Sequence, residues 1–187
     1  MTRDGQSARG HWLRAALEQY ERPLLAYAAR LVNSTDLARD VVQDTFIRLC
    51  AADRRQVGDH LGPWLFRVCR NRALDLRRKE KRMRRLNDPA TAAGAGYQPP
   101  PGVALESRES TTQALQLVAA LPERQQEAVR LRFQGGLSYK EIAEVLGISV
   151  TNVGVTLHTA IKTIREQMGL RPSADGESSP ASGRIEQ

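Results

Sequence analysis

The sequence YKEIAEVLGISVTNVGVTLHTAIKTIR, from Tyr139 to Arg165, has the residue spacing of two helices joined by a tight turn. Ala143 is small enough to let a second helix cross close above the first. Gly147 follows at the turn, where a left-handed backbone costs little only for glycine. Ser149 can cap the second helix by accepting from its free N–H groups. The pattern predicts a helix-turn-helix, which places its second helix in the major groove of DNA.

The second helix of this motif has an apolar side and a polar side. Its buried side is predicted from a repeat at helical spacing, comprising Val153, Leu157, Ala160 and Ile164. The opposite side carries short polar side chains and methyl groups, which can reach base edges and thymine methyls. It comprises Thr151, Asn152, Val155, Thr156, Thr159, Lys162 and Thr163. An ordinary pair of surface helices joined by a glycine turn is the alternative.

The composition favours a polyanionic partner. Of the 187 residues, 41% are hydrophobic, and no apolar run is long enough to cross a bilayer. The formal charge of +7 and the pI of about 10.0 favour nucleic acid, although charge alone does not separate DNA from RNA or an anionic membrane surface. The amino terminus does not resemble a secretory signal, so we expect a cytoplasmic protein without membrane insertion.

The two cysteines and three histidines are dispersed along the chain. Cys50 and Cys69 stand alone in apolar helical contexts and are expected to be small core residues. No spacing typical of metal ligands or of a catalytic triad is present. We therefore predict no metal site and no cofactor.

Two small helical domains joined by a flexible linker are expected. Residues 87–110 are rich in proline, glycine and alanine, a composition typical of an extended connector. Helical periodicity dominates over residues 10–86 and 111–170, whereas residues 171–187 have the composition of a disordered tail. No segment shows the sustained alternation of a strand, so the predicted fold class is all-α.

The first block opens with a segment, Trp12 to Val32, that is either one helix or a pair broken near Pro23. Its inward-facing residues are expected to be Leu13, Leu17, Leu24, Ala28 and Leu31. The next helix should run from about Asp36 to Ala52, capped by Ser34 or Thr35. Its apolar side comprises Ala38, Val41, Val42, Thr45, Phe46 and Leu49. Its other side, which we call the acidic face, comprises Asp40, Gln43, Asp44 and Ile47.

A third helix should begin near Pro63 and continue through a run dense in arginine. Its inward stripe is expected to comprise Trp64, Leu65, Val68, Cys69 and Leu76. The opposite side, which we call the basic face, comprises Arg67, Arg70, Arg77 and Arg78, with Asn71 at its border. We expect this face to be a second nucleic-acid surface, well away from the helix-turn-helix. A solvated basic face is the alternative.

The second block is predicted to open with an amphipathic helix over Thr111 to Leu121. Pro122 starts a further helix that runs through Phe133 and is ended by a pair of glycines. Ser138 can then cap the first helix of the helix-turn-helix.

Three stretches in these blocks resemble the extracytoplasmic-function (ECF) group of bacterial RNA polymerase sigma factors, within the sigma-70 family. They are DLARDVVQDTFIRL at Asp36 to Leu49, PWLFRVCRNRALDLRR at Pro63 to Arg78, and LPERQQEAVRLRF from Leu121 into the helix-turn-helix. They occur in the family's order, with its variable linker between the second and the third. The resemblance implies a protein that is not an enzyme, binds core RNA polymerase and directs promoter-specific initiation.

The resemblance also implies a role for each surface of the first block. The acidic face would dock on a coiled coil of the polymerase β′ subunit, with the β subunit as a further partner. The basic face would engage the -10 element of promoter DNA, with Asn71 at the exposed non-template strand and the arginines at phosphates. The loop from Ala52 to Gly62 would hold a flipped base, which offsets part of the free energy lost on unstacking.

The second block corresponds to the domain that reads the -35 element, with Ser149 to Arg165 as recognition helix. The implied contacts are Lys140, Thr151, Asn152, Val155, Thr156, Thr159 and Lys162. The family often has basic residues where this sequence has Gly154, Thr156 and Thr159, a departure that reduces phosphate attraction. Many relatives are held inactive by an anti-sigma factor, so we expect such a partner.

Two other functions fit parts of the sequence. A stand-alone helix-turn-helix transcriptional regulator would explain the second block but would leave the acidic face without a role. A nucleic-acid enzyme is the more distant alternative. Asp40 and Asp44 are four residues apart and could in principle hold Mg²⁺, but two exposed carboxylates on one helix are more often a charged surface or docking face. The chain also has no phosphate-binding glycine loop and no activated nucleophile.

Overall fold

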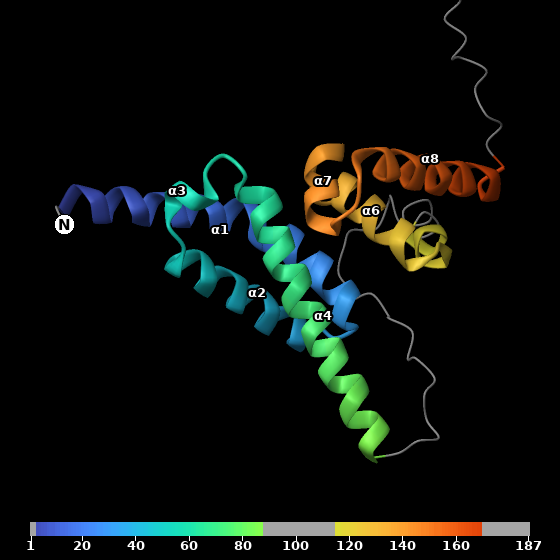
Figure 1. Ribbon diagram of the computed structural model, residues 1–187, viewed down its shortest axis with the longest axis horizontal. Helices are drawn as coiled ribbons and strands as arrows, with labels where there is room; N and C mark the ends of the chain where they lie inside the picture. Colours follow the sequence, from blue (N-terminus) through green and yellow to red (C-terminus); the bar gives the residue numbers. More distant parts are fainter. Residues whose placement is uncertain (1–2, 88–114, 170–187) are drawn as a thin grey trace, which may run out of the picture.

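The structure, a computed structural model, describes residues 3–87 and 115–169, and the regular elements within these ranges are helices (Figure 1). They are α1 (Arg3–Val32), α2 (Thr35–Ala51), α3 (Arg54–Val57), α4 (Leu61–Asn87), α6 (Glu123–Phe133), α7 (Tyr139–Leu146) and α8 (Val150–Gln167). Residues 115–120 are also helical. The all-α prediction is confirmed over the described ranges. The expected linker beyond Asn87, residues 111–114 and the expected tail lie outside the described residues.

The first helix, α1, is continuous through Pro23, so this segment is one helix and not a broken pair. Ala16 is buried before the proline, and Leu24 and Tyr27 are buried after it. Packing against α2 and α4 therefore holds both halves in line. The prediction that Leu17 faces inward is wrong, because the buried side of this turn is centred on Ala16 and leaves Leu17 exposed.

Helix α2 has the predicted cap and the predicted buried side. Ser34 is its N-cap, and the Ser34 hydroxyl accepts from the N–H of Leu37 at 3.3 Å. Thr45 lies fully buried on the apolar side, and its hydroxyl donates to the carbonyl of Val41 at 2.8 Å. This bond matters because leaving a buried hydroxyl without a partner costs about 1–3 kcal/mol.

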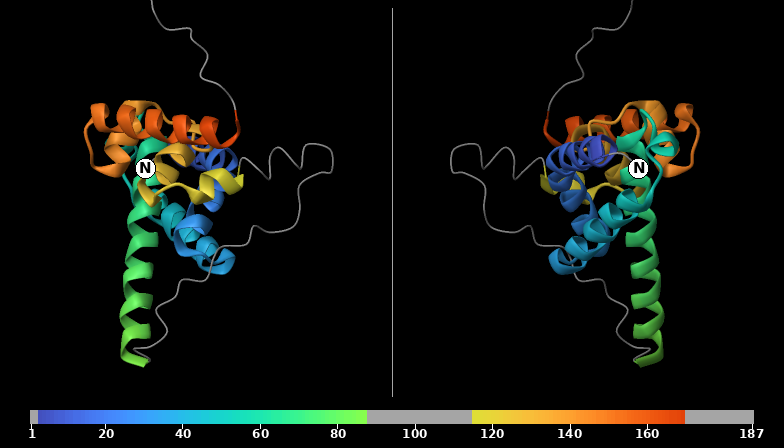
Figure 2. Two further views of the ribbon diagram at one scale, coloured as in Figure 1. Left: turned by 90° about the vertical axis from the view of Figure 1, so that its right-hand side faces the viewer. Right: turned by 90° about the vertical axis from the view of Figure 1, so that its left-hand side faces the viewer.

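Helix α4 begins at Leu61 and is buried on two sides in its first half. One side is the predicted stripe, in which Leu65 and Cys69 are fully buried. The other side, which the sequence did not indicate, contains Phe66 and Ala73. The second half of α4 extends beyond the other helices, as both side views show (Figure 2).

The helix-turn-helix is confirmed as α7 and α8. Ser138 forms a capping box with Glu141: its Oγ accepts from the Glu141 N–H at 3.3 Å, and its own N–H donates to Glu141 Oε2 at 2.7 Å. Gly147 has a φ of 67°, the left-handed conformation that favours glycine. The Ser149 hydroxyl accepts from the N–H of Asn152 at 3.2 Å and so caps α8.

The two blocks pack against each other, which contradicts the expectation that the basic face lies well away from the helix-turn-helix. Helix α4 contacts both α1 and α7, and buried side chains from both blocks form one hydrophobic cluster. Figures 1 and 2 show α7 beside the first half of α4. The sequence could not show this contact because each amphipathic helix is consistent with packing inside its own block alone.

The prediction that both cysteines are core residues is wrong for Cys50. Cys69 is fully buried, whereas Cys50 lies on the exposed side of the last turn of α2. Burial raises the pKa of the Cys69 thiol to about 12, so its reactive thiolate is scarce near neutral pH.

We therefore expect iodoacetamide at about pH 8 to modify Cys50 and to spare Cys69 in the folded protein. Mass spectrometry of proteolytic peptides measures both reactions, and unfolding in urea supplies the control in which both thiols react. Equal modification of the two cysteines without urea would contradict the burial of Cys69.

Candidate nucleic-acid and partner interfaces

The acidic face lies on the outer side of α2, as expected. Asp40 and Gln43 are exposed, and Ile47, a large apolar residue, is 57% exposed. Asp44 differs from them, because its Oδ2 accepts from Nε of Arg72 on α4 at 2.7 Å and its side chain is only 39% exposed. Asp44 thus joins α2 to α4, while the other three residues remain available to a partner.

The basic face of α4 does not form a single open surface. Arg67 and Asn71 are exposed, and Arg78 pairs with Asp75 of its own helix at 3.1 Å. Arg77 reaches across to Glu123 of α6 at 3.4 Å. The prediction that Arg70 points outward is wrong, because its side chain is turned toward α6, where it pairs with Glu127.

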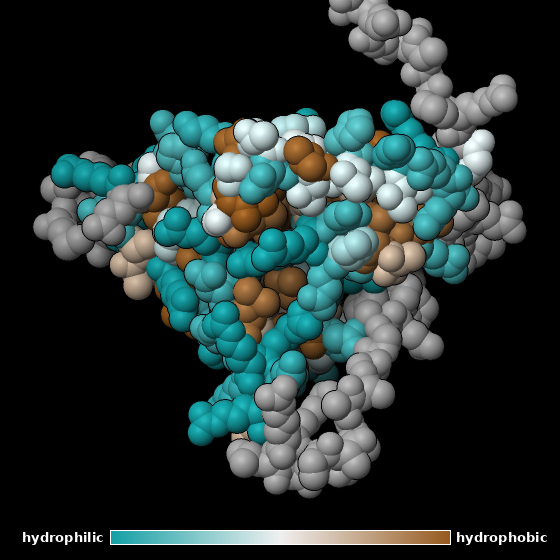
Figure 3. Space-filling view, turned by 45° about the vertical axis from the view of Figure 1, so that its right-hand side comes forward, coloured by the Kyte–Doolittle hydropathy of each residue, from teal (hydrophilic) through white to brown (hydrophobic). Residues whose placement is uncertain are grey.

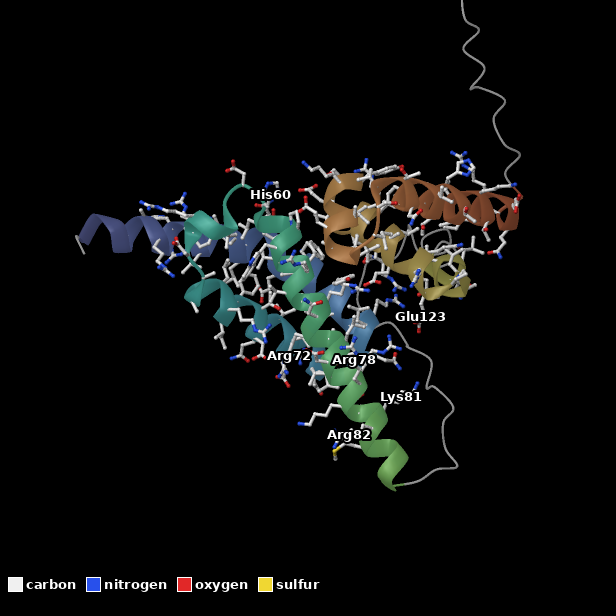
Figure 4. The ribbon with its side chains drawn as sticks, viewed as in Figure 1. His60, Arg72, Arg78, Lys81, Arg82 and Glu123 are labelled. Atoms are coloured by element: carbon white, nitrogen blue, oxygen red, sulfur yellow. The ribbon has the colours of Figure 1, made fainter. Side chains whose placement is uncertain are left out.

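Further basic residues follow on the part of α4 that extends away from the other helices. Figure 4 shows Arg78, Lys81 and Arg82 along this part, and all three are exposed. Glu123 lies across from them on α6 (Figure 4). The exposed positive charge of α4 is therefore concentrated on its second half, where α7 and α8 do not cover it.

Glu127 is the centre of the contact between the two blocks. Its Oε1 accepts from the hydroxyl of Tyr27 at 2.7 Å and from Nε of Arg70 at 2.8 Å, while its Oε2 accepts from Nη2 of Arg70 at 3.3 Å. The side chains of Arg70 and Glu127 are 23% and 11% exposed. We call these three residues the interblock cluster. Such charge-assisted hydrogen bonds are stronger than neutral ones.

The protonation of the interblock cluster follows from its surroundings. Burial and the neighbouring charge of Glu127 raise the pKa of Tyr27 well above its ordinary value. Burial acts to lower the pKa of Arg70, but the hydrogen bond and charge of Glu127 outweigh it, so the net shift is upward. Tyr27 therefore stays a neutral donor and Arg70 stays a cation at physiological pH.

Close packing of Phe66 accompanies the interblock cluster. The rings of Tyr27 and Phe66 meet edge to face, with centroids 5.4 Å apart. The Phe66 ring also rests on Gly135, where an added Cβ would lie 3.0 Å from the ring and 2.8 Å from the carbonyl oxygen of Leu131. Gly135 is needed for this close approach, because no side chain fits between the loop and the ring.

The predicted DNA face of α8 is largely exposed. Val155 is 62% exposed, Thr156 is half-buried, and Lys162 lies 3.9 Å from Glu166 in a loose ion pair. The other exposed members of the face are Thr151, Asn152 and Thr159, and Lys140 is exposed on α7. Figure 3 shows residues of intermediate hydropathy, drawn white, along the top of the molecule, where Figure 1 places α8.

Sequence reasoning missed two features of the second block. Arg130 is buried and donates to Oε1 of Gln126 at 2.7 Å. An apolar groove of about 420 Å³ lies between α6 and α8, with Phe133, Val129 and Ile164 among its lining residues. The signal for the groove was an aromatic residue, Phe133, at the end of a helix and two residues before a pair of glycines.

Within the described ranges, no helix is long and apolar enough to cross a membrane. No group of three or more His, Cys, Asp and Glu side chains is placed to hold a metal ion among the residues that the structure describes.

Comparison with known proteins matches both blocks to one family. The family described as "Sigma-70 region 2" matches residues 16–83, and "Sigma-70, region 4" matches residues 111–164. The ECF RNA polymerase sigma factor EcfG of Rhodopseudomonas palustris is 30% identical over 154 residues, covering 82% of this chain and 81% of that protein. The ECF RNA polymerase sigma factor SigL of Mycobacterium tuberculosis is 30% identical over 156 residues, covering 82% and 86%.

A solved structure shares the fold. The sigma factor RpoE of Bartonella quintana, crystallised in complex with the anti-sigma factor NepR, superposes with a TM-score of 0.62. The comparison covers 90% of this chain and 99% of that chain, at 23% sequence identity. The similarity extends across both blocks.

Proposed function

Because the chain belongs to the ECF group of the sigma-70 family of RNA polymerase sigma factors, we propose that α2 binds core polymerase, α4 binds the -10 element and α8 binds the -35 element. One observation carries this assignment: three chemically different exposed surfaces lie on three separate helices. An acidic face with an apolar residue suits a basic protein partner, whereas an arginine-rich face and a face of hydroxyls and methyls suit DNA.

The polymerase contact is assigned to Asp40, Gln43 and Ile47. Ile47 is exposed among polar side chains and provides the apolar centre of a docking surface. The carboxylates of the acidic face attract a basic partner and orient it as it binds. The β′ coiled coil is the proposed partner of this face. Asp44 acts indirectly, because its pair with Arg72 fixes α2 against α4.

The -10 contact is assigned to Arg67, Asn71 and Arg78, which are exposed, together with Arg70 and Arg77. Arg70 is paired with the nearly buried Glu127 of α6, so it reaches DNA only when α6 moves away from α4, whereas Arg77 is exposed and pairs only loosely with Glu123. The described arrangement is therefore a closed state in which the second block covers part of the promoter-binding surface. Opening must accompany promoter binding.

Other partners and properties follow from the family. An anti-sigma factor that holds the two blocks together would stabilise the closed state, and the similarity to a sigma factor solved with such a partner supports this proposal. The polymerase supplies the chemistry of RNA synthesis, so we propose that the chain itself is not an enzyme and acts in the cytoplasm, where its DNA template lies.

Promoter opening tests the -10 assignment. We expect Asn71→Ala to reduce the permanganate reactivity of unpaired -10 thymines by about tenfold in the complex with core polymerase, because a base contact is worth about 1–3 kcal/mol. Affinity for core polymerase should stay unchanged. Lys79→Ala, at an exposed position on the same helix, is the matched control.

Two outcomes would contradict this assignment. Wild-type opening by Asn71→Ala would remove the role of Asn71. Tight promoter binding by the isolated chain, without any opening when polymerase is added, would favour a stand-alone regulator.

A further inference from the structure

Three threonines of α8 use their hydroxyl groups within their own helix. Thr156 donates to the carbonyl of Asn152 at 2.7 Å, Thr159 to that of Val155 at 2.8 Å, and Thr163 to that of Thr159 at 3.0 Å. Each bond spans four residues, the usual back-bonding geometry of threonine in a helix. The only proton of each hydroxyl is thereby committed to the helix.

This bonding changes what the face offers to DNA. The two heavy-atom branches of a threonine Cβ are a hydroxyl and a methyl, so a hydroxyl held against the helix leaves the methyl as the outward branch. With 100° per residue, Thr156, Thr159 and Thr163 lie within about 60° of one another around the helix axis. Val155, which is 62% exposed, adds two methyl groups beside them. At these four positions the face therefore presents methyl groups rather than hydrogen-bond donors.

We propose that α8 reads the 5-methyl groups of thymine in the -35 element through the methyls of Val155, Thr156 and Thr159. In the major groove the thymine methyl is the one apolar feature that distinguishes a base, and side-chain methyls are suited to contact it. Asn152, exposed on the same face, is the residue left to pair with adenine. The inference rests on the proposed function, because it specifies which base feature the -35 surface recognises.

The test removes one methyl group at a time, from the DNA or from the protein. The full chain is bound to core polymerase, and the -35 element of a promoter that this holoenzyme transcribes is synthesised with deoxyuridine for thymidine at each position. Deoxyuridine lacks only the 5-methyl group, so pairing is kept. We expect about a fourfold loss of promoter affinity at each contacted thymine, the value of one buried methyl group.

Two variants of Thr156 separate the methyl from the hydroxyl. Thr156→Ser keeps the hydroxyl and removes the methyl, and it should both weaken binding and abolish the deoxyuridine effect at one position. Thr156→Val keeps a methyl and removes the hydroxyl, and it should preserve both affinity and the deoxyuridine effect. The pair forms a double-mutant cycle with the DNA substitution. Thermal unfolding of both variants checks that α8 stays folded.

Each outcome decides the proposal. A -35 element without thymine, no deoxyuridine effect, or a greater loss in Thr156→Val than in Thr156→Ser would overturn methyl readout while leaving the -35 assignment intact. No transcription of any promoter by the wild-type holoenzyme would instead overturn the proposed function. Deoxyuridine outside both promoter elements is the control for nonspecific effects on the duplex.

Discussion

Glu127→Gln is expected to open the contact between the two blocks, lowering the ratio of closed to open protein by about 10- to 100-fold. The substitution keeps the size of the side chain but removes the charge that Arg70 needs, since the Arg70 side chain is only 23% exposed. Hydrogen bonds to charged groups contribute about 1.5–3 kcal/mol, which corresponds to this range. Tyr27 can still donate to the glutamine carbonyl, so its hydroxyl keeps a partner.

The distance between spin labels measures this opening. Cys50 is exposed on α2 and serves as the first site, and Glu144→Cys places the second on the exposed side of α7, while Cys69 is buried. Glu123→Gln is the matched control, because Glu123 is 84% exposed and lies 3.4 Å from Arg77. Exposed ion pairs contribute little, so this variant should stay closed. Identical distance distributions in both variants and the wild type would refute a clamping role for Glu127.

Asp40→Arg is expected to weaken binding to core polymerase by at least about tenfold, because a like charge placed against a basic partner costs several kcal/mol. Asp40 is the better test of the acidic face than Asp44. It is exposed and forms no ion pair with the described residues, whereas changing Asp44 also breaks its 2.7 Å contact with Arg72. The stability of the Asp40→Arg protein should therefore match that of the wild type.

Titration of the fluorescently labelled protein with core polymerase at several salt concentrations measures the effect of Asp40→Arg on binding affinity. The wild-type affinity should fall with salt more steeply than that of the variant, because the variant has lost a favourable charge interaction. Glu18→Arg, a charge reversal at an exposed position of α1, is the control and should bind like the wild type. If the two variants bind polymerase equally well, the acidic face is not the docking surface.

Local sequence predicted the helix-turn-helix in detail, because its determinants are local. Gly147 adopts the left-handed turn, and Ser138 and Ser149 cap the helices that follow them, all through contacts within four residues. The exposure of the acidic face was also predictable, since a helical wheel shows which side opposes the core. Whether Pro23 interrupts α1 depended on tertiary packing, and here the sequence left two alternatives open.

The missed features depend on contacts between segments far apart in the chain. Arg70 lies on the polar side of the helical wheel of α4, so the sequence predicts that it faces solvent. Its hydrogen bond to Glu127, 57 residues away, instead places it in the contact between the two blocks. Phe66 is buried because α7 and the Gly135 loop cover a second side of α4. One feature of the sequence did indicate this contact. Glu127 precedes an alanine and a valine on the apolar side of α6, and a carboxylate buried there needs a cationic partner.

Run-off transcription by purified core RNA polymerase on a library of random promoter sequences, with and without this chain, decides whether the three surfaces work together. We expect transcripts with fixed start sites only when the chain is present, from templates that share two separated sequence elements. Transcription that is the same without the chain, or templates that share only the element bound by α8, would contradict the assignment of α2 and α4 to polymerase and the -10 element.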